Sequence, residues 1–198
     1  MKLSDKEFNA MNHPLRRWIQ LLYEWPIMRK MGLELARRDV LEIGCGSGYG
    51  AQLMAKQSPH GYVGIDLMRE QVELARERGL GGCEFMQGDV ADLSAFPEGS
   101  FDLVVDFGIL HHVPAWRKVA SECMRVLRPG GLLLVEEPEG MFLQRFDQLF
   151  HWGHPEEAAF SEKEFEAGLT ALGLRIEKQR RAFGFFWVSA RKTHLIGA

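Results

Sequence analysis

The stretch Val40-Leu41-Glu42-Ile43-Gly44-Cys45-Gly46-Ser47-Gly48-Tyr49-Gly50 decides the fold of this chain, because an apolar run leads directly into four glycines at alternate positions. The apolar run predicts a buried strand, and the glycines let the backbone bend through conformations with positive φ. Residues 51–57 are good helix formers, so the bend opens onto a helix N-terminus. The missing Cβ atoms of Gly44, Gly46 and Gly48 let a small ligand approach the main chain. The stretch therefore favours a ligand-binding loop over a purely structural turn.

The class of ligand stays open at this point. Residues 46–51 also fit the loose dinucleotide-binding fingerprint G-x-G-x-x-G/A. A nucleotide cofactor and other small ligands are both compatible with this bend.

Length and composition predict a single α/β domain spanning residues 1–198. An apolar content of 46% suffices for a substantial core at this length. A net charge of −3 gives no overall attraction to nucleic acid or to anionic membranes, while leaving room for a local basic patch. A small-molecule partner is favoured.

The cysteines and the N-terminus predict a cytoplasmic protein. Cys45, Cys83 and Cys123 lack the spacing of a disulfide framework or of a zinc site, so we expect no metal. Residues 1–7 lack the apolar segment of a signal peptide, and no window approaches the roughly 18 apolar residues needed to span a bilayer.

Residues 1–38 predict an N-terminal helical arm in which Pro26 breaks or restarts the helix. One face of this arm is apolar and comprises Leu15, Trp18, Ile19, Leu22 and Trp25. The simplest interpretation is a helix packed on the body of the domain. The alternatives are a lid over the ligand loop, or a surface for a dimer or a membrane partner.

Strands and helices then alternate, which predicts a parallel sheet with right-handed crossovers. Strands are expected near residues 40–43, 62–66, 83–89, 101–106 and 132–137. The second and third end in Asp66 and Asp89, and parallel strands place these acids at one edge of the sheet, beside the glycine bend. Asp66 is suited to bind ribose hydroxyls, although it could also cap the helix that follows.

The remainder of the chain departs from this alternation. Residues 138–160 form an aromatic insertion of undetermined structure, which includes Phe142 and Trp152. Ser161 and Glu164 form a capping box for a helix that ends near Gly173. Two closing strands near residues 174–181 and 185–192 are close enough to form an antiparallel hairpin.

Several motifs in order resemble class I S-adenosylmethionine-dependent methyltransferases, most of all their small-molecule branch. The motifs are Glu42-x-Gly44-x-Gly46-x-Gly48, Asp66, Gly88-Asp89-Val90, the block 101–113 with its His-His-Val, and Leu127-Arg128-Pro129-Gly130-Gly131. The resemblance covers roughly residues 38–137. It implies a three-layer Rossmann-like sandwich with a seven-stranded, mostly parallel sheet and a last strand that is antiparallel.

The resemblance also implies the cofactor, S-adenosyl-L-methionine, and its product, S-adenosyl-L-homocysteine. Residues 39–137 would form the donor-binding core, and residues 161–198 the helix and closing hairpin. The expected donor-binding residues are Glu42, Gly44, Cys45, Gly46, Gly48, Asp66, Leu67, Asp89, Val90, Asp106, Phe107 and Gly108. Among them, Asp66 would hold the ribose hydroxyls and Asp89 the adenine amino group.

Two other functions remain as alternatives. One is a donor-binding protein of the same fold without catalysis. The other, an NAD(P)-dependent oxidoreductase, is less favoured because no tyrosine starts the Tyr-x-x-x-Lys pair of short-chain dehydrogenases.

Candidate catalytic residues follow the fourth strand. His111 and His112 titrate near neutral pH and are predicted at the edge of the sheet where a methyl group would sit, so either could act as a general base. Glu136 and Glu137 are weaker candidates, one of which we expect to point to solvent or to a neighbouring loop. Because Asp106-Phe107-Gly108-Ile109 replaces the Asn/Asp-Pro-Pro-Tyr motif, we expect a small-molecule acceptor and no nucleic acid.

Overall fold

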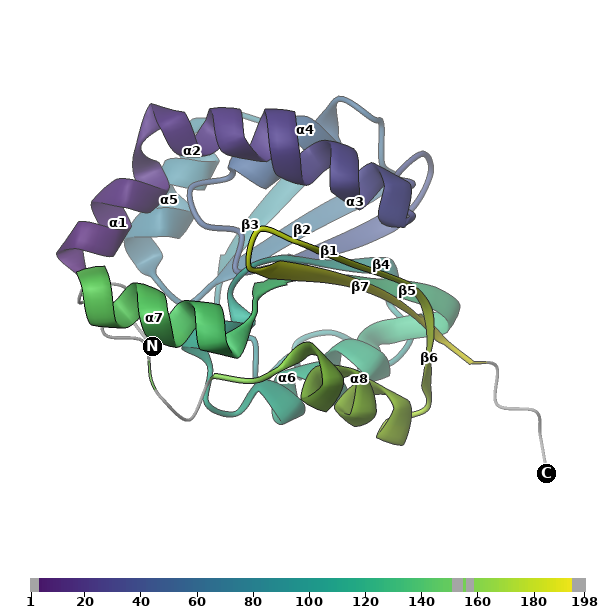
Figure 1. Cartoon of the computed structure of the whole chain (residues 1–198). Coiled ribbons are helices and arrows are strands. Elements are labelled where there is room, and N and C mark those ends of the chain that lie inside the picture. Colours follow the sequence, from purple (N-terminus) through teal and green to yellow (C-terminus); the bar gives the residue numbers. More distant parts are fainter. Residues whose placement is uncertain (1–3, 151–154, 156–158, 194–198) are drawn as a thin grey trace.

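A computed structural model describes residues 4–150, 155 and 159–193, and its centre is a seven-stranded sheet with the order β3-β2-β1-β4-β5-β7-β6 (Figure 1). The strands are β1 (Asp39–Ile43), β2 (Gly61–Asp66), β3 (Cys83–Gln87), β4 (Phe101–Phe107), β5 (Leu127–Pro138), β6 (Leu174–Ala182) and β7 (Phe185–Lys192). The five strands β1–β5 are parallel to one another, and β7 is antiparallel to both β5 and β6. The predicted Rossmann-like sheet with its antiparallel hairpin is confirmed.

Helices cover both faces of the sheet and form the outer layers (Figure 1). One layer includes α3 (Trp25–Met31), α4 (Tyr49–Ala55) and α5 (Arg69–Glu77), and the other includes α6 (Trp116–Val126) and α8 (Glu162–Ala171). Each layer packs on its own apolar cluster, because the buried strands present apolar side chains to both faces. The capping box of Ser161 and Glu164 starts α8, as the sequence predicts.

The N-terminal arm contains α1 (Asp5–Asn12) and a second helix that runs without a break from Pro14 to Met31. This second helix consists of α2 (Pro14–Ile19), a π-helical turn, η1 (Gln20–Glu24), and α3. Pro26 was expected to break or restart the helix: it lies in the first turn of the α-helical segment α3, while the chain stays helical on both sides. The wider π turn lies just before Pro26, where a proline has no N–H and its ring disturbs the preceding turn.

The orientation of α2 and η1 also differs from the simplest prediction. Leu15, Trp18, Ile19 and Leu22 were expected to pack on the domain, yet their exposed fractions are 59%, 56%, 43% and 69%. The opposite, polar side of the helix faces the protein instead. Arg16 on that side pairs with the buried Glu24, with Nη1 2.5 Å from Oε1. Burying a charge is tolerated when it is paired in this way.

The aromatic insertion contains a helix, α7 (Gly140–Phe150), which lies at the same end of the molecule as α1 (Figure 1). Its Phe142 packs on the β6–β7 turn, where an added Cβ on Gly184 would lie 2.4 Å from the Phe142 ring. Trp152 and the other residues of 151–154 and 156–158 lie outside the described part of the chain.

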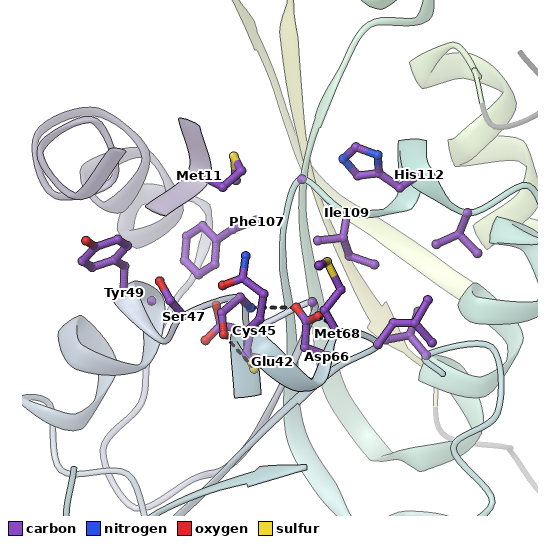
Figure 2. Close-up of a pocket in the computed structure, with 18 of the residues that line it drawn as sticks. Met11, Glu42, Cys45, Ser47, Tyr49, Asp66, Met68, Phe107, Ile109 and His112 are labelled. Carbon is purple, nitrogen blue, oxygen red and sulfur yellow. Dashed lines mark hydrogen bonds between the residues drawn. The ribbon is translucent and has the colours of Figure 1, made fainter. Parts of the chain in front are cut away.

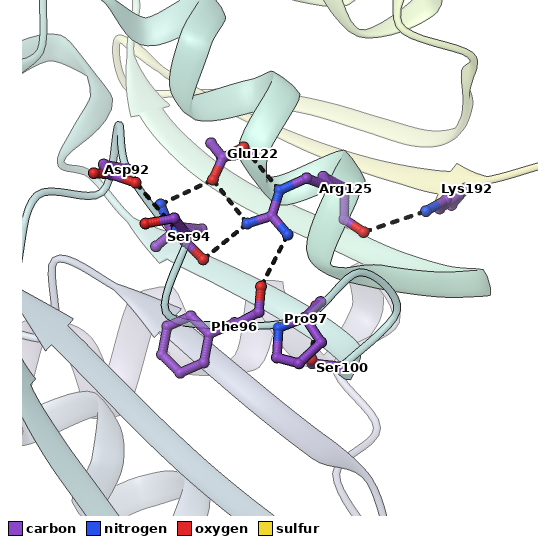
Figure 3. Close-up of polar contacts among 9 residues, drawn as sticks. Asp92, Ser94, Phe96, Pro97, Ser100, Glu122, Arg125 and Lys192 are labelled. Atoms are coloured by element: carbon purple, nitrogen blue, oxygen red, sulfur yellow. Dashed lines mark hydrogen bonds and ion pairs between the residues drawn. The ribbon is translucent and has the colours of Figure 1, made fainter.

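The irregular segment between β3 and β4 is held by Arg125 of α6 (Figure 3). The Arg125 guanidinium donates to the carbonyl oxygens of Phe96 and Leu93, at 2.9 and 2.8 Å. It also binds the carboxylate of Glu122, which accepts from the Leu93 N–H at 2.9 Å. These bonds satisfy buried backbone groups that have no strand partner. They thereby fix the segment that begins with Asp89.

Candidate functional site

A cavity of about 370 Å³ lies at the carboxyl ends of β1, β2 and β4, beneath the N-terminal arm. This volume is within the range of about 300–1,000 Å³ that is usual for small-molecule sites. Figure 2 shows Met11 and His112 on one side of it and Glu42 and Asp66 on the other. Of the predicted site residues, the lining contains Glu42, Gly44, Cys45, Gly46, Asp66, Leu67, Asp89, Val90, Phe107, Gly108 and His112.

The glycines of the bend have different roles. An added Cβ on Gly44 would lie 2.1 Å from Cγ2 of Ile109, and one on Gly48 would lie 3.1 Å from Cβ of Ala75. Both glycines therefore allow close packing within the protein, and Gly48 is not part of the cavity lining. At Gly46 an added Cβ meets no described atom within 4 Å. Of the three positions where a ligand was expected to approach the backbone, Gly46 is the open one.

Asp66 fixes the bend from the end of β2. Its Oδ2 accepts from the Gly46 N–H and its Oδ1 accepts from the Met68 N–H, both at 2.9 Å. A carboxylate has about four lone-pair sites, so acceptor capacity remains on both oxygens. Burial raises the pKa of Asp66, and the two backbone N–H groups oppose that rise.

Glu42 carries a buried carboxyl group at the base of the cavity. Its Oε2 accepts a hydrogen bond from the hydroxyl of Tyr62, which is itself buried. Burial raises the pKa of Glu42 to about 8, although the bond from Tyr62 opposes the shift. Glu42 is therefore predominantly protonated at neutral pH while the cavity holds no cation.

Two predicted site residues lie next to the cavity but are not part of its lining. Asp106 is fully buried, and its Oδ1 accepts from the Ile109 N–H at 2.9 Å. Burial and the nearby charge of Glu137 raise the pKa of Asp106. His111 turns its Nδ1 toward Glu137 Oε2, 2.7 Å away. The sequence placed both residues at the right strand end but could not show which way they face.

Glu137 supports the turn η2 (Leu110–His112) from below. Its carboxylate accepts from the N–H groups of Leu110 and His111, at 2.6 and 3.2 Å. Glu137 thus points to a neighbouring loop, as one of the two glutamates was expected to do. The other, Glu136, is also buried and accepts from Nε1 of Trp187 at 2.7 Å. Neither carboxyl group faces solvent.

His112 is the predicted histidine that lines the cavity. Its Nε2 lies 3.3 Å from Oε1 of Glu7, a buried residue of α1. A carboxylate bound to one ring nitrogen orients the imidazole and stabilises its protonated form. Glu7 was not among the predicted site residues because the sequence gives no indication that α1 reaches η2.

The arm supplies further residues that were not predicted as site residues. Met11, Arg16 and Gln20 line the cavity from above. Arg16 and Gln20 are four positions apart and so share one face of the helix. In the sequence, the indication that the arm contributes to the site was this pair of polar residues, at helical spacing within an apolar segment. Below them, Oε1 of the buried Gln71, on α5, accepts no hydrogen bond from any described residue.

The model of a methyltransferase domain family matches residues 41–135, which include most of β1, all of β2, β3 and β4, and the carboxyl ends that form the cavity. Residues 41–135, slightly less than half of the chain, are thus similar to a methyltransferase domain. The match omits the arm and everything beyond residue 135, within β5, which is where the resemblance seen in the sequence also weakens.

The curated relatives that match this segment are named as methyltransferases. A fatty-acid O-methyltransferase of Mycolicibacterium smegmatis is 42% identical over 99 residues, which are 49% of this chain and 36% of that protein. A phthiotriol/phenolphthiotriol dimycocerosates methyltransferase of Mycobacterium ulcerans is 39% identical over 104 residues, 52% of this chain and 38% of that protein. The chain thus covers less than half the length of these relatives.

Solved structures extend the likeness to most of the chain. An S-adenosylmethionine-dependent methyltransferase from Mesorhizobium loti matches with a TM-score of 0.74 and 20% identity, covering 85% of this chain and 97% of that chain. A protein of the same description from Methanosarcina mazei matches with a TM-score of 0.67, 28% identity and the same two coverages. The fold beyond the matched family segment is therefore that of these enzymes.

The contrast between two glycines of the bend can be tested by substitution. Gly44→Ala should destabilise the protein by about 1–2 kcal/mol because φ is +68°, and by about 1–3 kcal/mol more because of the contact with Ile109. At Gly46 φ is similar, +50°, but the added Cβ would contact no described atom, so Gly46→Ala should lose only the roughly 1–2 kcal/mol that comes from the positive φ. Urea unfolding measures both. Equal losses of stability in the two variants would contradict the packing role of Gly44.

The protonation of Glu42 should appear in the pH dependence of stability. Between the ordinary pKa of 4.5 and the raised pKa of about 8, the unfolded chain loses a proton that the folded chain keeps, so this group lowers stability as pH rises. Glu42→Gln removes that contribution, and its free energy of unfolding should fall less steeply with pH than that of the wild type. Glu34→Gln, at a side chain that is 77% exposed, is the matched control. An unchanged slope in Glu42→Gln would show that Glu42 ionises normally.

Proposed function

We propose that this protein transfers a methyl group from S-adenosylmethionine to a small apolar acceptor. The observation that carries the proposal is the meeting of Asp66, Asp89 and the open backbone at Gly46 around one cavity. Acids that face ribose and adenine, without a cluster of anion-binding groups, suit an adenosyl sulfonium better than a dinucleotide.

The adenosyl half of the donor fits the carboxyl ends of β2 and β3. Asp66 keeps acceptor capacity for the two ribose hydroxyls, and the exposed Asp89 is available at the end where the adenine edge would lie. Oδ1 of Asp89 accepts from the Ala91 N–H at 2.8 Å, which fixes the loop that carries the neighbouring Val90. Val90 would contact the adenine ring.

The methionine half fits the deeper end of the cavity. A carboxyl group at Glu42 and a guanidinium at Arg16 match the ammonium and the carboxylate of an amino acid. The unsatisfied Oε1 of Gln71 is a further acceptor for that ammonium. When bound, S-adenosylmethionine supplies a methyl group activated by its positively charged sulfur.

The acceptor side of the cavity is apolar. It is lined by Met11, Phe107, Ile109 and Val113. This lining, together with the names of the lipid-acting relatives, supports an acceptor with an aliphatic chain. The protein's own contribution is to align the acceptor in line with the methyl group and to exclude water. Met11, Arg16 and Gln20 close the cavity from above, so the arm serves as its lid.

His112 would act as the general base where the acceptor has a proton to lose. Its ring lines the cavity, and Glu7 stabilises the protonated imidazole that such a transfer produces. An ionised carboxylic acid has no proton at the attacking oxygen and needs no base, whereas an alcohol does. Loss of His112 should therefore affect transfer to an alcohol alone if the residue acts as a base, and transfer to both acceptors if it only packs in the site.

Donor binding tests the proposal without knowledge of the acceptor. Asp66→Ala should weaken binding of S-adenosylmethionine, measured by calorimetry, by about 30-fold or more, because two hydrogen bonds to a charged group are lost. Asp92→Ala is the matched control, since Asp92 is exposed and lies outside the cavity lining. An unchanged affinity in Asp66→Ala would show that Asp66 does not hold the ribose.

Transfer of a radiolabelled methyl group tests catalysis. We compare a long-chain fatty acid with the alcohol of equal chain length, in the wild type and in His112→Ala. Removal of a general base should lower transfer to the alcohol by about 100-fold or more and leave transfer to the carboxylate nearly unchanged. Equal losses with both acceptors would place His112 in binding instead. Donor binding without transfer to either acceptor would favour the non-catalytic alternative.

A further inference from the structure

The exposed apolar side of the N-terminal arm, which we call the arm face, consists of Leu15, Trp18, Ile19 and Leu22. Their exposed fractions of 59%, 56%, 43% and 69% are unusual for consecutive positions on one helical face. A surface helix in a soluble domain normally turns such a face to the core. Contiguous exposed apolar side chains of this kind mark an interaction surface.

The outward direction of the apolar side chains has a structural cause, since the other side of the same helix contacts the cavity. Arg16 and Gln20 line the cavity, and Arg16 pairs with Glu24, which is buried. Turning the apolar side inward would expose these bonds and remove the roof of the cavity. The arm face is therefore directed away from the protein by the same contacts that close the site.

We propose that the arm face docks on the surface of an anionic lipid bilayer. The helix from Pro14 to Met31 contains one acidic residue, Glu24, and that residue is buried in its pair with Arg16. Arg29 and Lys30 lie in the last turn of the same helix, and both are exposed. A helix with an apolar side and exposed cations is typical of helices that lie in the membrane interface.

A third cation adds positive charge at the C-terminal end of this helix. Nζ of Lys178, on β6, donates to the carbonyl oxygen of Lys30 at 2.9 Å and remains exposed. The acids nearest to these cations in the sequence are paired elsewhere: Glu34 lies 3.7 Å from Arg38, and Glu177 lies 2.7 Å from Arg191. The positive charges of Arg29, Lys30 and Lys178 match the negative charge of phosphatidylglycerol and similar headgroups.

The same charges disfavour a second copy of the chain as the occupant. In a twofold symmetric dimer, each patch meets its own copy. Antiparallel packing of the arm faces would bring a cationic end of one helix against an apolar stretch of the other, and parallel packing would bring like charges together. Trp18 also favours lipid, since tryptophan is enriched where the hydrocarbon core meets water.

A neighbouring aromatic side chain extends the surface. Phe183, at the tip of the β6–β7 turn, is 83% exposed and adopts φ of +52°, which a bulky residue rarely does. Its ring centroid lies 5.9 Å from that of Tyr23, so the tip is directly beside η1. A strained and exposed phenylalanine next to an exposed apolar helix fits insertion into the same interface.

Docking at the surface agrees with the helices of the described residues, none of which is long and apolar enough to cross a membrane. The proposal goes beyond methyl transfer and does not depend on it. In this arrangement the arm lies between the bilayer and the cavity: the arm face contacts the lipid, and the polar side of the helix lines the cavity.

Flotation with lipid vesicles tests the proposal. The wild type should float with vesicles of equal parts phosphatidylcholine and phosphatidylglycerol, bind less to pure phosphatidylcholine, and release as salt is raised. The double variant Trp18→Ser/Leu22→Ser should bind at least about tenfold more weakly, because two apolar side chains are lost. Leu74→Ser, at a 36% exposed apolar position on α5 outside the arm face, is the control and should bind as the wild type does.

Three results would overturn the proposal. They are absence of flotation of the wild type, equal flotation of the double variant, and a wild-type dimer in sedimentation equilibrium that the double variant converts to a monomer. Reversing charge with Arg29→Glu/Lys30→Glu should reduce flotation on the anionic vesicles alone. Calorimetry with S-adenosylmethionine on the same variants keeps the two proposals separate, because Trp18 and Leu22 lie outside the cavity and should leave donor affinity unchanged.

Discussion

The structure depends on the pair of hydrogen bonds that Asp66 accepts at the carboxyl end of β2. One comes from Gly46 in the bend after β1, and the other comes from Met68 just before α5. A single carboxylate thus joins two crossover connections and holds the bend open at Gly46. Buried backbone N–H groups without a partner are costly, so this arrangement stabilises the site as well as shaping it. Because oxygen lone pairs remain, the same group is available to a ligand.

Buried carboxyl groups are concentrated around this region, and each has a distinct partner. Glu42 receives a hydroxyl, Glu136 an indole N–H, and Glu137 two backbone N–H groups together with His111. Burial raises the pKa of all three, and of these carboxyl groups only Glu42 lines the cavity.

The arm connects the cavity to the exterior. Its polar side supplies Arg16 and Gln20 to the roof, and its α1 brings Glu7 to His112. Its apolar side is exposed, although the helix is amphipathic enough to have packed the other way. The π turn at Gln20–Glu24 adjusts the helix ahead of Pro26, and such turns are frequent at functional sites. We infer that lid and docking surface are two sides of one element.

The sequence by itself determined the parallel sheet, the glycine bend and the acids at strand ends. These follow from local alternation of apolar segments and from the rule that parallel strands end at one edge. It could not decide which side of the arm faces inward, because amphipathicity gives a periodicity and no partner. Tertiary structure decided this through the buried pair of Arg16 and Glu24. It also separated His112, in the cavity, from its neighbour His111, since side-chain direction in a turn depends on contacts distant in sequence.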